Sequence, residues 1–92
     1  MVTGFYSDNF SKVFSRLLEK SSVTCYKISN YAHIDEAYLS RLKSGEKNNP
    51  TAEVVLRISL ALVHLDPHIT LHDIEALLNS AGRSIFPKRQ GS

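Results

Sequence analysis

Residues 24–50 decide the fold, and they read TCYKISNYAHIDEAYLSRLKSGEKNNP. Thr24 predicts the start of a helix that runs to about Ala32, because its hydroxyl can accept a hydrogen bond from a first-turn N–H group. A break follows at 33–35, and Asp35 is a favourable N-cap for a second helix over 36–44. The stretch therefore predicts two short helices separated by a tight turn.

Both helices have an apolar pair on one face and polar residues on the other. The pairs are Ile28 with Ala32 and Leu39 with Leu42. Gly45 predicts the end of the second helix, because glycine adopts a positive φ without steric cost. Pro50 prevents a helix from continuing through the polar loop that follows. This is the pattern of a helix-turn-helix, in which the second helix rests on the first and can enter a DNA major groove about 12 Å wide.

Three more helices are predicted around this pair from caps and from the apolar period. The first helix is expected to begin after Asp8 or Asn9 and to end at Ser21-Ser22. The fourth is expected to begin after Thr51 and to end at Asp66-Pro67, and the fifth to begin after Thr70 and to end at Gly82. Asp73 and Thr70 together resemble a capping box. The expected inward-facing residues are Phe10, Val13, Phe14, Leu17, Leu18, Val55, Ile58, Ser59, Leu62, Leu71, Ile74, Leu77, Leu78 and Ala81.

The fourth helix is apolar almost all the way round. Leu56, Leu60 and Val63 lie outside its core stripe, which predicts that this helix is the central and most buried one. No segment shows the strict alternation of apolar and polar residues that is typical of a strand. The predicted fold class is therefore all-α, with five short helices.

The composition limits the class of protein further. The 92 residues fit one domain, 42% of them are hydrophobic, and the net charge of +2 permits a nucleic-acid partner without requiring one. The single cysteine excludes a disulfide framework, and no apolar run approaches the ~18 residues of a membrane span. No secretory leader is recognisable, so we expect a cytoplasmic protein. We expect an N-terminal arm over 1–9, a helix-turn-helix domain over 10–83 and a basic tail over 84–92.

From Val23 to Gly45 the sequence resembles the Cro/repressor-type (XRE-like) helix-turn-helix family. The similarity is strongest in YLSRLKSG (38–45), which is followed by Asn49-Pro50 and then by VVLRISLAL (54–62). The ending around Leu77-Leu78 and Ala81-Gly82 also resembles family members, so the likeness covers roughly 10–83. The resemblance implies a lambda-repressor-like bundle whose second and third helices form the helix-turn-helix.

Three residues depart from the family pattern. His33 stands at the position of the turn glycine, and a positive φ is uncommon for a residue with a side chain, so the turn is expected to be either strained or differently shaped. Cys25 replaces a glutamine that reaches a phosphate, and a thiol at a helix N-terminus is expected to have a lowered pKa, which would permit redox tuning of a DNA contact. Ser29 replaces a small alanine that packs between the two helices.

The resemblance also assigns DNA contacts to residues of this chain. Base contacts are expected from Glu36, Ala37, Tyr38 and Arg41, and phosphate contacts from Thr24, Cys25, Tyr26, Lys43, Ser44, Lys47 and Asn48. Arg41 could pair with guanine, Glu36 could accept from cytosine, and Ala37 could touch a thymine methyl group. The alternatives are that Glu36, Arg41 and Lys43 form an ordinary solvated helix face and that Tyr38 packs inward.

The sequence therefore favours a sequence-specific regulator of transcription that binds double-stranded DNA as a homodimer and reads the major groove with helix 36–44. We expect no enzymatic activity and no cofactor. The alternative is an antitoxin-like or adaptor protein that uses the same scaffold to bind another protein. The charge map distinguishes the two functions. It is defined by Tyr26, Lys27, Arg41, Lys43 and Lys47. If these groups share one face and Glu36 and Glu46 are held in ion pairs, DNA binding is favoured, whereas acids that interrupt the face favour the adaptor function.

Two further patterns carry less weight. His64, His68 and His72 are spaced four apart, but Pro67 interrupts the run, so no metal site is expected. The surplus apolar residues are expected to pack on the last helix, and the alternative is a homodimer or partner surface. These residues are Leu56, Leu60, Val63, Ile85 and Phe86.

Overall fold

The computed structural model describes residues 9–82, and this part of the chain contains five α-helices and no strand. The helices are α2 (Phe10–Ser21), α3 (Cys25–Ala32), α4 (Glu36–Ser44), α5 (Ala52–Leu65) and α6 (Leu71–Ser80). The all-α class is confirmed, and each helix lies where the caps and the apolar period placed it. Residues 1–8 of the expected arm and the basic tail, with Ile85 and Phe86, lie outside the described residues.

A side-chain cap begins each of these helices. Asn9, Thr24, Asp35, Thr51 and Thr70 each accept a hydrogen bond from the main-chain N–H three residues further on. Such a cap stabilises a helix by roughly 1 kcal/mol, because the first-turn N–H groups have no partner within the helix. Asp73 also accepts a hydrogen bond from the N–H of Thr70 at 3.0 Å, which confirms the capping box.

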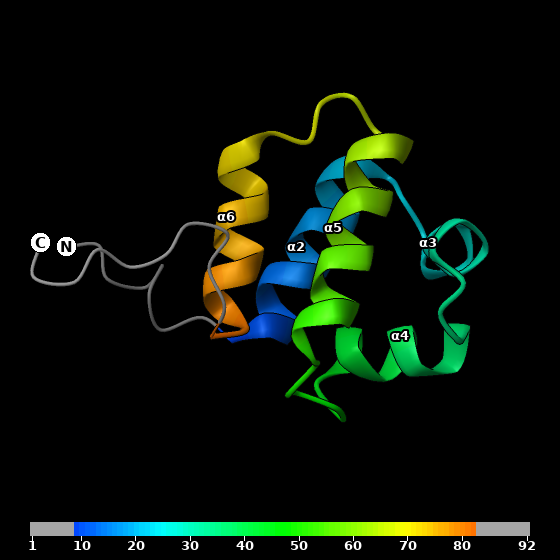
Figure 1. Cartoon of the computed structure of the whole chain (residues 1–92), viewed down its shortest axis with the longest axis vertical. Helices are drawn as coiled ribbons and strands as arrows, with labels where there is room; N and C mark the ends of the chain where they lie inside the picture. The colour runs from blue at the N-terminus through cyan, green and yellow to red at the C-terminus, as the bar shows by residue number, and fades with distance from the viewer. Residues whose placement is uncertain (1–8, 83–92) are drawn as a thin grey trace, which may run out of the picture.

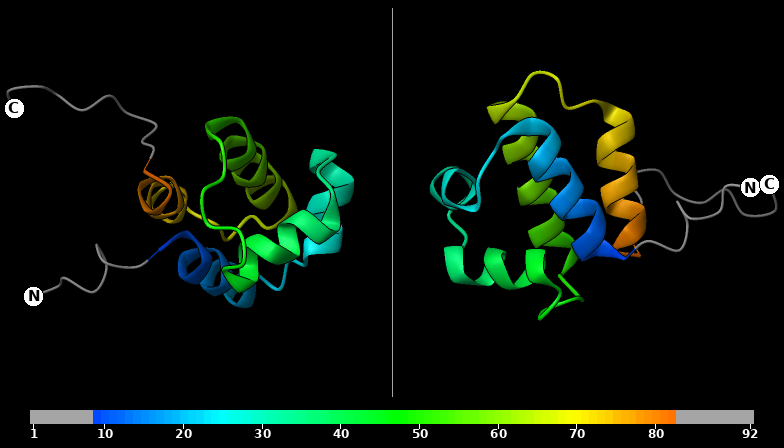
Figure 2. Two further views of the ribbon diagram at one scale, coloured as in Figure 1. Left: turned by 90° about the horizontal axis from the view of Figure 1, so that it is seen from below. Right: turned by 180° about the vertical axis from the view of Figure 1, so that it is seen from behind.

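The helices form a small bundle with α4 across one end. α2, α5 and α6 make up the body of the bundle, and α4 lies crosswise near the lower end of α5, on the side away from α6 (Figure 1). The views from below and from behind place α4 at the same edge of the molecule (Figure 2). α2 packs against α4 and α6, α3 packs against α4 and α5, and α5 packs against α6. α3 and α4, the two helices of the helix-turn-helix, therefore contact each other, but α4 also packs on α2 whereas α3 also packs on α5.

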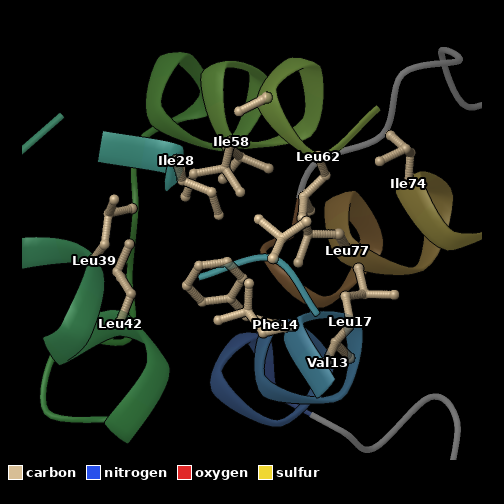
Figure 3. Close-up of a cluster of buried hydrophobic side chains, with 14 of the residues drawn as sticks. Val13, Phe14, Leu17, Ile28, Leu39, Leu42, Ile58, Leu62, Ile74 and Leu77 are labelled. Carbon is tan, nitrogen blue, oxygen red and sulfur yellow. The ribbon is translucent and has the colours of Figure 1, made fainter. Parts of the chain in front are cut away.

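The core lies inside this arrangement and reaches the inner faces of α3 and α4. Phe14 of α2 points toward Ile58 and Leu62 of α5, and Leu77 of α6 lies beside them (Figure 3). All four side chains are completely buried, as is Ile28 of α3. Burial of a side chain of this size contributes about 1.5–3 kcal/mol. The same core that stabilises the bundle thus also fixes the helix-turn-helix.

Part of the expected core is exposed instead. Leu56, Leu60 and Val63 on the outer side of α5 are 46%, 65% and 49% exposed, and Leu71 at the start of α6 is 60% exposed. The prediction that this helix is the most buried one is wrong, because α3 and α6 cover only part of its circumference. The inward placement of Leu71 is also wrong, since Leu71 lines a groove between α5 and α6 that is open to solvent.

Candidate nucleic-acid interface

α4 is buried along one face and exposed along the other. Leu39 and Leu42 have no exposed surface, whereas Glu36, Ala37 and Arg41 are exposed. The two leucines anchor the helix in the core, and the three outward residues are the ones that sequence reasoning assigned to base contacts. The fold thus brings these three together on one solvent-facing side of a single helix.

Tyr38 differs from the other residues that were expected to contact bases. Its side chain is half-buried and packs against the core cluster, as the alternative interpretation of the sequence proposed. Its main-chain N–H donates a hydrogen bond to Asp35 Oδ2 at 3.1 Å, which caps the start of α4. Glu36 follows in the first turn, where a carboxylate complements the positive end of the helix dipole.

Two serines of α2 hold the C-terminal end of α4. The hydroxyls of Ser11 and Ser15 donate to the main-chain carbonyl oxygen of Lys43 at 3.2 and 3.1 Å. Gly45 follows α4 with a φ of +93°, and a Cβ at this position would lie only 3.3 Å from the Oγ of Ser11. The positive φ therefore favours glycine, and a Cβ would in addition have to displace the hydroxyl of Ser11 by a few tenths of an ångström.

The turn between α3 and α4 contains a histidine in the left-handed region. His33 has φ 58° and ψ 47°, so of the two expected outcomes the structure shows the strained one, with a positive φ at a histidine. Its N–H donates to the carbonyl of Ser29 at 2.9 Å and so ends α3. Ile34, the next residue, is buried and anchors the turn in the core. Sequence reasoning treated Ile34 as part of the break and missed this role, although an apolar residue inside a polar turn was a usable signal.

Several expected phosphate contacts meet in a hollow at the start of α3. Thr24 and Cys25 line it together with Ser40 and Lys43 of α4, and its volume is about 380 Å³. Thr24 Oγ1 accepts a hydrogen bond from the N–H of Lys27 at 3.1 Å. Ser40 was not expected here, but its position four residues after Glu36 and three before Lys43 places it on the exposed face of α4.

The pKa of the Cys25 thiol differs from the expected direction. Burial is the largest influence and raises the pKa of the Cys25 thiol, the charge of Lys43 lowers it, and the charge of Glu36 raises it. The outcome is a raised pKa, so the prediction that the position at a helix N-terminus lowers it is wrong. The half-buried side chain packs against the core, and its desolvation outweighs the charge of Lys43. The raised pKa favours the protonated thiol.

The segment after α4 carries the remaining expected phosphate contacts. Lys47 and Asn48 are exposed, and so is Tyr26 at the start of α3, by 61%. The hydroxyl of Ser44 is already engaged locally, because it donates to the carbonyl of Arg41 at 3.1 Å and accepts from the N–H of Glu46 at 3.3 Å. The hydroxyl of Ser44 thus links the last turn of α4 to the residue that follows Gly45.

The acids near this surface are only partly neutralised. Glu46 Oε1 lies 4.0 Å from Arg41 Nε, and both side chains are largely exposed, so the pair is weak. Glu36 makes no ion pair with any residue in the range 9–82. Glu46 is therefore weakly paired, whereas Glu36, at the beginning of α4, has no ion-pair partner among residues 9–82.

α3 is tied to α5 by two contacts that sequence reasoning did not find. The rings of Tyr31 and His64 stack with centroids 4.3 Å apart. Arg57 Nη1 donates to the carbonyl of Ala32, the last residue of α3, at 3.5 Å. A cation near the C-terminal end of a helix is favourable because the free carbonyl groups concentrate there. Both contacts join residues that are far apart in sequence, so no local pattern indicates them.

Other kinds of site are not evident in the part of the chain that the structure describes. It contains no group of three or more His, Cys, Asp or Glu side chains placed to hold a metal ion. Of the three spaced histidines, His64 lies on α5, His68 in the following loop and His72 on α6. None of the helices within residues 9–82 combines the length and the hydropathy that crossing a bilayer requires.

Comparison of the chain with models of known families, with curated proteins and with solved structures found no match.

Proposed function

We propose that this protein is a DNA-binding regulator of transcription, without enzymatic activity, that reads the major groove of double-stranded DNA with α4. One observation carries the proposal. α4 is anchored by completely buried Leu39 and Leu42, while Glu36, Ala37 and Arg41 on the other side are exposed to solvent. A single helix held at the edge of a domain in this way fits the major groove, which is about 12 Å wide.

The exposed residues of α4 supply chemistry that base edges recognise. The guanidinium of Arg41 can donate two hydrogen bonds to guanine, and the carboxylate of Glu36 can accept one from the amino group of cytosine. Ala37 can contact the methyl group of thymine. An acidic residue on this surface is compatible with DNA binding in this mode, because Glu36 then acts as a reader of one base.

The hollow at the start of α3 supports a phosphate contact beside this helix. Free N–H groups of the first turn and the positive end of the helix dipole favour an anion there. Thr24, Cys25 and Lys43 line the hollow, where Lys43 supplies a positive charge and Glu19 of α2 a negative one. Exposed Tyr26, Lys47 and Asn48 extend the set of phosphate contacts on either side of α4. Such contacts set the register of the protein on DNA, while base contacts set its specificity.

The resemblance to the Cro/repressor-type family supports a dimer on a site of two half-sites. Two copies of α4 about 34–36 Å apart would enter successive major grooves on one side of the DNA. The near-neutral net charge of +2 predicts weak nonspecific binding. Affinity would then depend on the second copy and on a few base contacts.

Selection from a pool of random double-stranded DNA, at two salt concentrations, tests the proposal. A DNA reader enriches a motif, and its affinity falls as salt rises, because bound phosphates release counterions. The Arg41→Ala variant serves as the matched control, since the enriched motif should lose preference at one base pair. Absence of any enriched sequence at low salt would remove the proposed function.

A second function, an antitoxin-like or adaptor protein, is favoured by the open carboxylate of Glu36. This acid is exposed on the same helix as Arg41 and Lys43, and no residue of the range 9–82 forms an ion pair with it, so it adds an uncompensated negative charge to this surface. A mixed-charge face of this kind is typical of contacts between proteins. This function predicts that the DNA pool yields no motif while a protein partner binds the same face and is released by Arg41→Ala.

A further inference from the structure

An apolar groove between α5 and α6 is left open by residues 9–82. Its volume is about 310 Å³, and apolar side chains line both walls: Leu71, Ile74 and Leu78 on α6, and Leu56, Leu60 and Val63 on α5. Four of these side chains, Leu56, Leu60, Val63 and Leu71, are between 46% and 65% exposed. Single exposed leucines are ordinary on protein surfaces, but a contiguous apolar patch is typical of a contact site.

The chemistry of the groove restricts what can fill it. No charged residue lines it. Its one polar side chain, Ser59, is already satisfied, because its hydroxyl donates to the carbonyl of Val55 at 2.8 Å. An occupant must therefore bring apolar side chains and keep its charged groups outside.

The two ends of the groove lie at different distances from the end of α6. α5 runs upward and α6 runs downward in Figure 1, so Leu56 and Leu78 belong to the lower end of the groove. Val63 and Leu71 belong to its upper end. Leu78 comes four residues before Gly82, which is about 6 Å along a helix axis, whereas Leu71 comes eleven residues before it, about 17 Å away. The chain therefore continues beyond Gly82 from a point about one helical turn from the lower end.

Gly82 turns the chain off the axis of α6. Its φ is +76°, the left-handed conformation with which glycine commonly ends helices. Its N–H donates to the carbonyl of Asn79 at 3.0 Å, and a Cβ at this position would meet no atom within 4 Å. The turn thus lies in open space, and the helix is not prolonged past the groove.

We propose that Ile85 and Phe86 of the basic tail fill the lower half of this groove. They supply the two large apolar side chains of the tail, and Pro87, Lys88 and Arg89 follow them directly. The tail therefore brings apolar side chains together with charges that begin only after them, which is the pattern that the groove accepts. Burial of apolar surface on both sides is the driving force of such a contact.

The length of the connecting chain limits how far this contact extends. Phe86 is four residues beyond Gly82, so an extended chain spans at most about 13–14 Å between them. This reach covers the lower end of the groove around Leu78, and it falls short of Leu71 at the upper end. The contact accordingly covers Leu56 and leaves Val63 as exposed as before.

Covalent attachment favours the tail over an occupant from another molecule. A segment joined by a short stretch of chain is present near its site at an effective concentration of about 1 mM, however dilute the protein is. A second copy or another protein would have to displace it. The contact does not involve α4, so it stands or falls independently of DNA binding.

Thiol labelling of the full chain tests the contact. In a Cys25→Ser background, Leu56→Cys places the only thiol at the lower end of the groove, and Val63→Cys places it at the upper end as the matched control. Replacement of Ile85 and Phe86 together by serine should raise the rate at which a maleimide labels position 56 at least about tenfold and leave the rate at position 63 unchanged. Circular dichroism checks that each variant is folded. Equal rates at position 56 with and without the two tail residues would overturn the proposal.

Two comparisons identify any other occupant. Replacement of Phe5 and Tyr6 together by serine removes two large apolar side chains from the other end of the chain and should leave labelling at position 56 unchanged. An increase would show that the N-terminal segment fills the groove. Protection of position 56 that grows between about 10 µM and about 1 mM protein would show that a second copy fills it. Either result would overturn the proposal.

A disulfide within one chain tests the placement of the tail. In the same Cys25→Ser background, the pair Leu56→Cys and Phe86→Cys should link on copper-catalysed air oxidation, in which oxygen takes up the two electrons and two protons of the thiols. Mass spectrometry identifies the product as a monomer that is two hydrogen atoms lighter. The pair Val63→Cys and Phe86→Cys should not link. Failure of the first pair, or linkage of the second pair in its place, would overturn the placement.

Discussion

The hydroxyl of Ser15 on α2 donates a hydrogen bond to the main-chain carbonyl of Lys43 at 3.1 Å and so fastens the end of α4 to the body of the bundle. Ser11 donates to the same oxygen at 3.2 Å. Carbonyl groups in the last turn of a helix have no partner within that helix, so both serines satisfy a group that would otherwise need water. The placement of α4 thus depends on a helix outside the helix-turn-helix.

Replacement of Ser11 and Ser15 together by alanine should lower the free energy of unfolding by about 1–2 kcal/mol, since each lost hydrogen bond contributes about 0.5–1.5 kcal/mol. Urea denaturation followed by circular dichroism measures this change. Ser40→Ala on the exposed side of α4 is the matched control and should change stability by less than about 0.5 kcal/mol. Equal stability of the double variant and the control would contradict the role of the two serines.

Replacement of His33 by glycine should raise the free energy of unfolding by about 0.5 kcal/mol. The left-handed conformation at φ 58° costs a residue with a side chain about 1–2 kcal/mol, and glycine avoids this cost but loses about 0.5–1 kcal/mol through the entropy of the unfolded chain. Thermal and urea unfolding measure the change. Asn30→Gly, inside α3, should have the opposite sign and destabilise by about 0.5–1 kcal/mol. A loss of stability in His33→Gly would show that the imidazole makes a contact that outweighs the strain.

Replacement of Asp73 by asparagine should lower the free energy of unfolding by about 1–2 kcal/mol at pH 7, because it weakens the capping box and the ion pair with Lys20 at 2.7 Å. Burial raises the pKa of the Asp73 carboxyl, but the hydrogen bonds from Lys20 and Thr70 and the charge of Lys20 outweigh it, so the pKa is lowered. The ionised carboxylate therefore stabilises the fold above its unfolded pKa of about 3.9, and this contribution disappears as the pH falls through the folded pKa.

The difference between wild type and Asp73→Asn should accordingly be constant from about pH 7 to about pH 5 and shrink below about pH 4. Urea unfolding at a series of pH values measures it. Glu19→Gln, which also removes one carboxylate at an exposed position on the same helix as Lys20, is the matched control. A difference that grows as the pH falls would mean that the carboxyl is protonated in the folded state.

Replacement of Arg41 by alanine should cost about 1–3 kcal/mol of binding free energy on the preferred DNA site and relax specificity at one base pair. Lys47→Ala should instead weaken binding to all sequences about equally and reduce the dependence of affinity on salt. Fluorescence anisotropy on the selected site and on single-base variants separates these effects. An Arg41→Ala variant that loses affinity uniformly would place Arg41 at a phosphate.

The boundaries of the helices could be predicted from the sequence because caps are local. Thr24, Asp35 and Thr51 each satisfy an N–H three residues away, and Gly45 marks an end through its own φ. The inward pair Leu39 and Leu42 followed from the helical period for the same reason. These features need no knowledge of the rest of the fold.

The exposure of α5 and the chemistry of Cys25 could not be predicted, because both depend on distant neighbours. An apolar residue on α5 is buried only where another helix covers it, and neither α3 nor α6 covers Leu60. The pKa of Cys25 depends mainly on how deeply its thiol is buried, and the sequence does not show that depth. The hydrogen bonds to Lys43 likewise join positions 28 and 32 residues apart.

Because α3 and α4 pack against different helices, the angle between them depends on how the bundle beneath them is packed. α4 packs on α2, and α3 packs on α5 through the Tyr31 and His64 stack. A change in the spacing of α2 and α5 would therefore alter this angle. We expect a smaller side chain at completely buried Phe14 to change the affinity of the outer face of α4 for its partner, even though Phe14 cannot touch that partner.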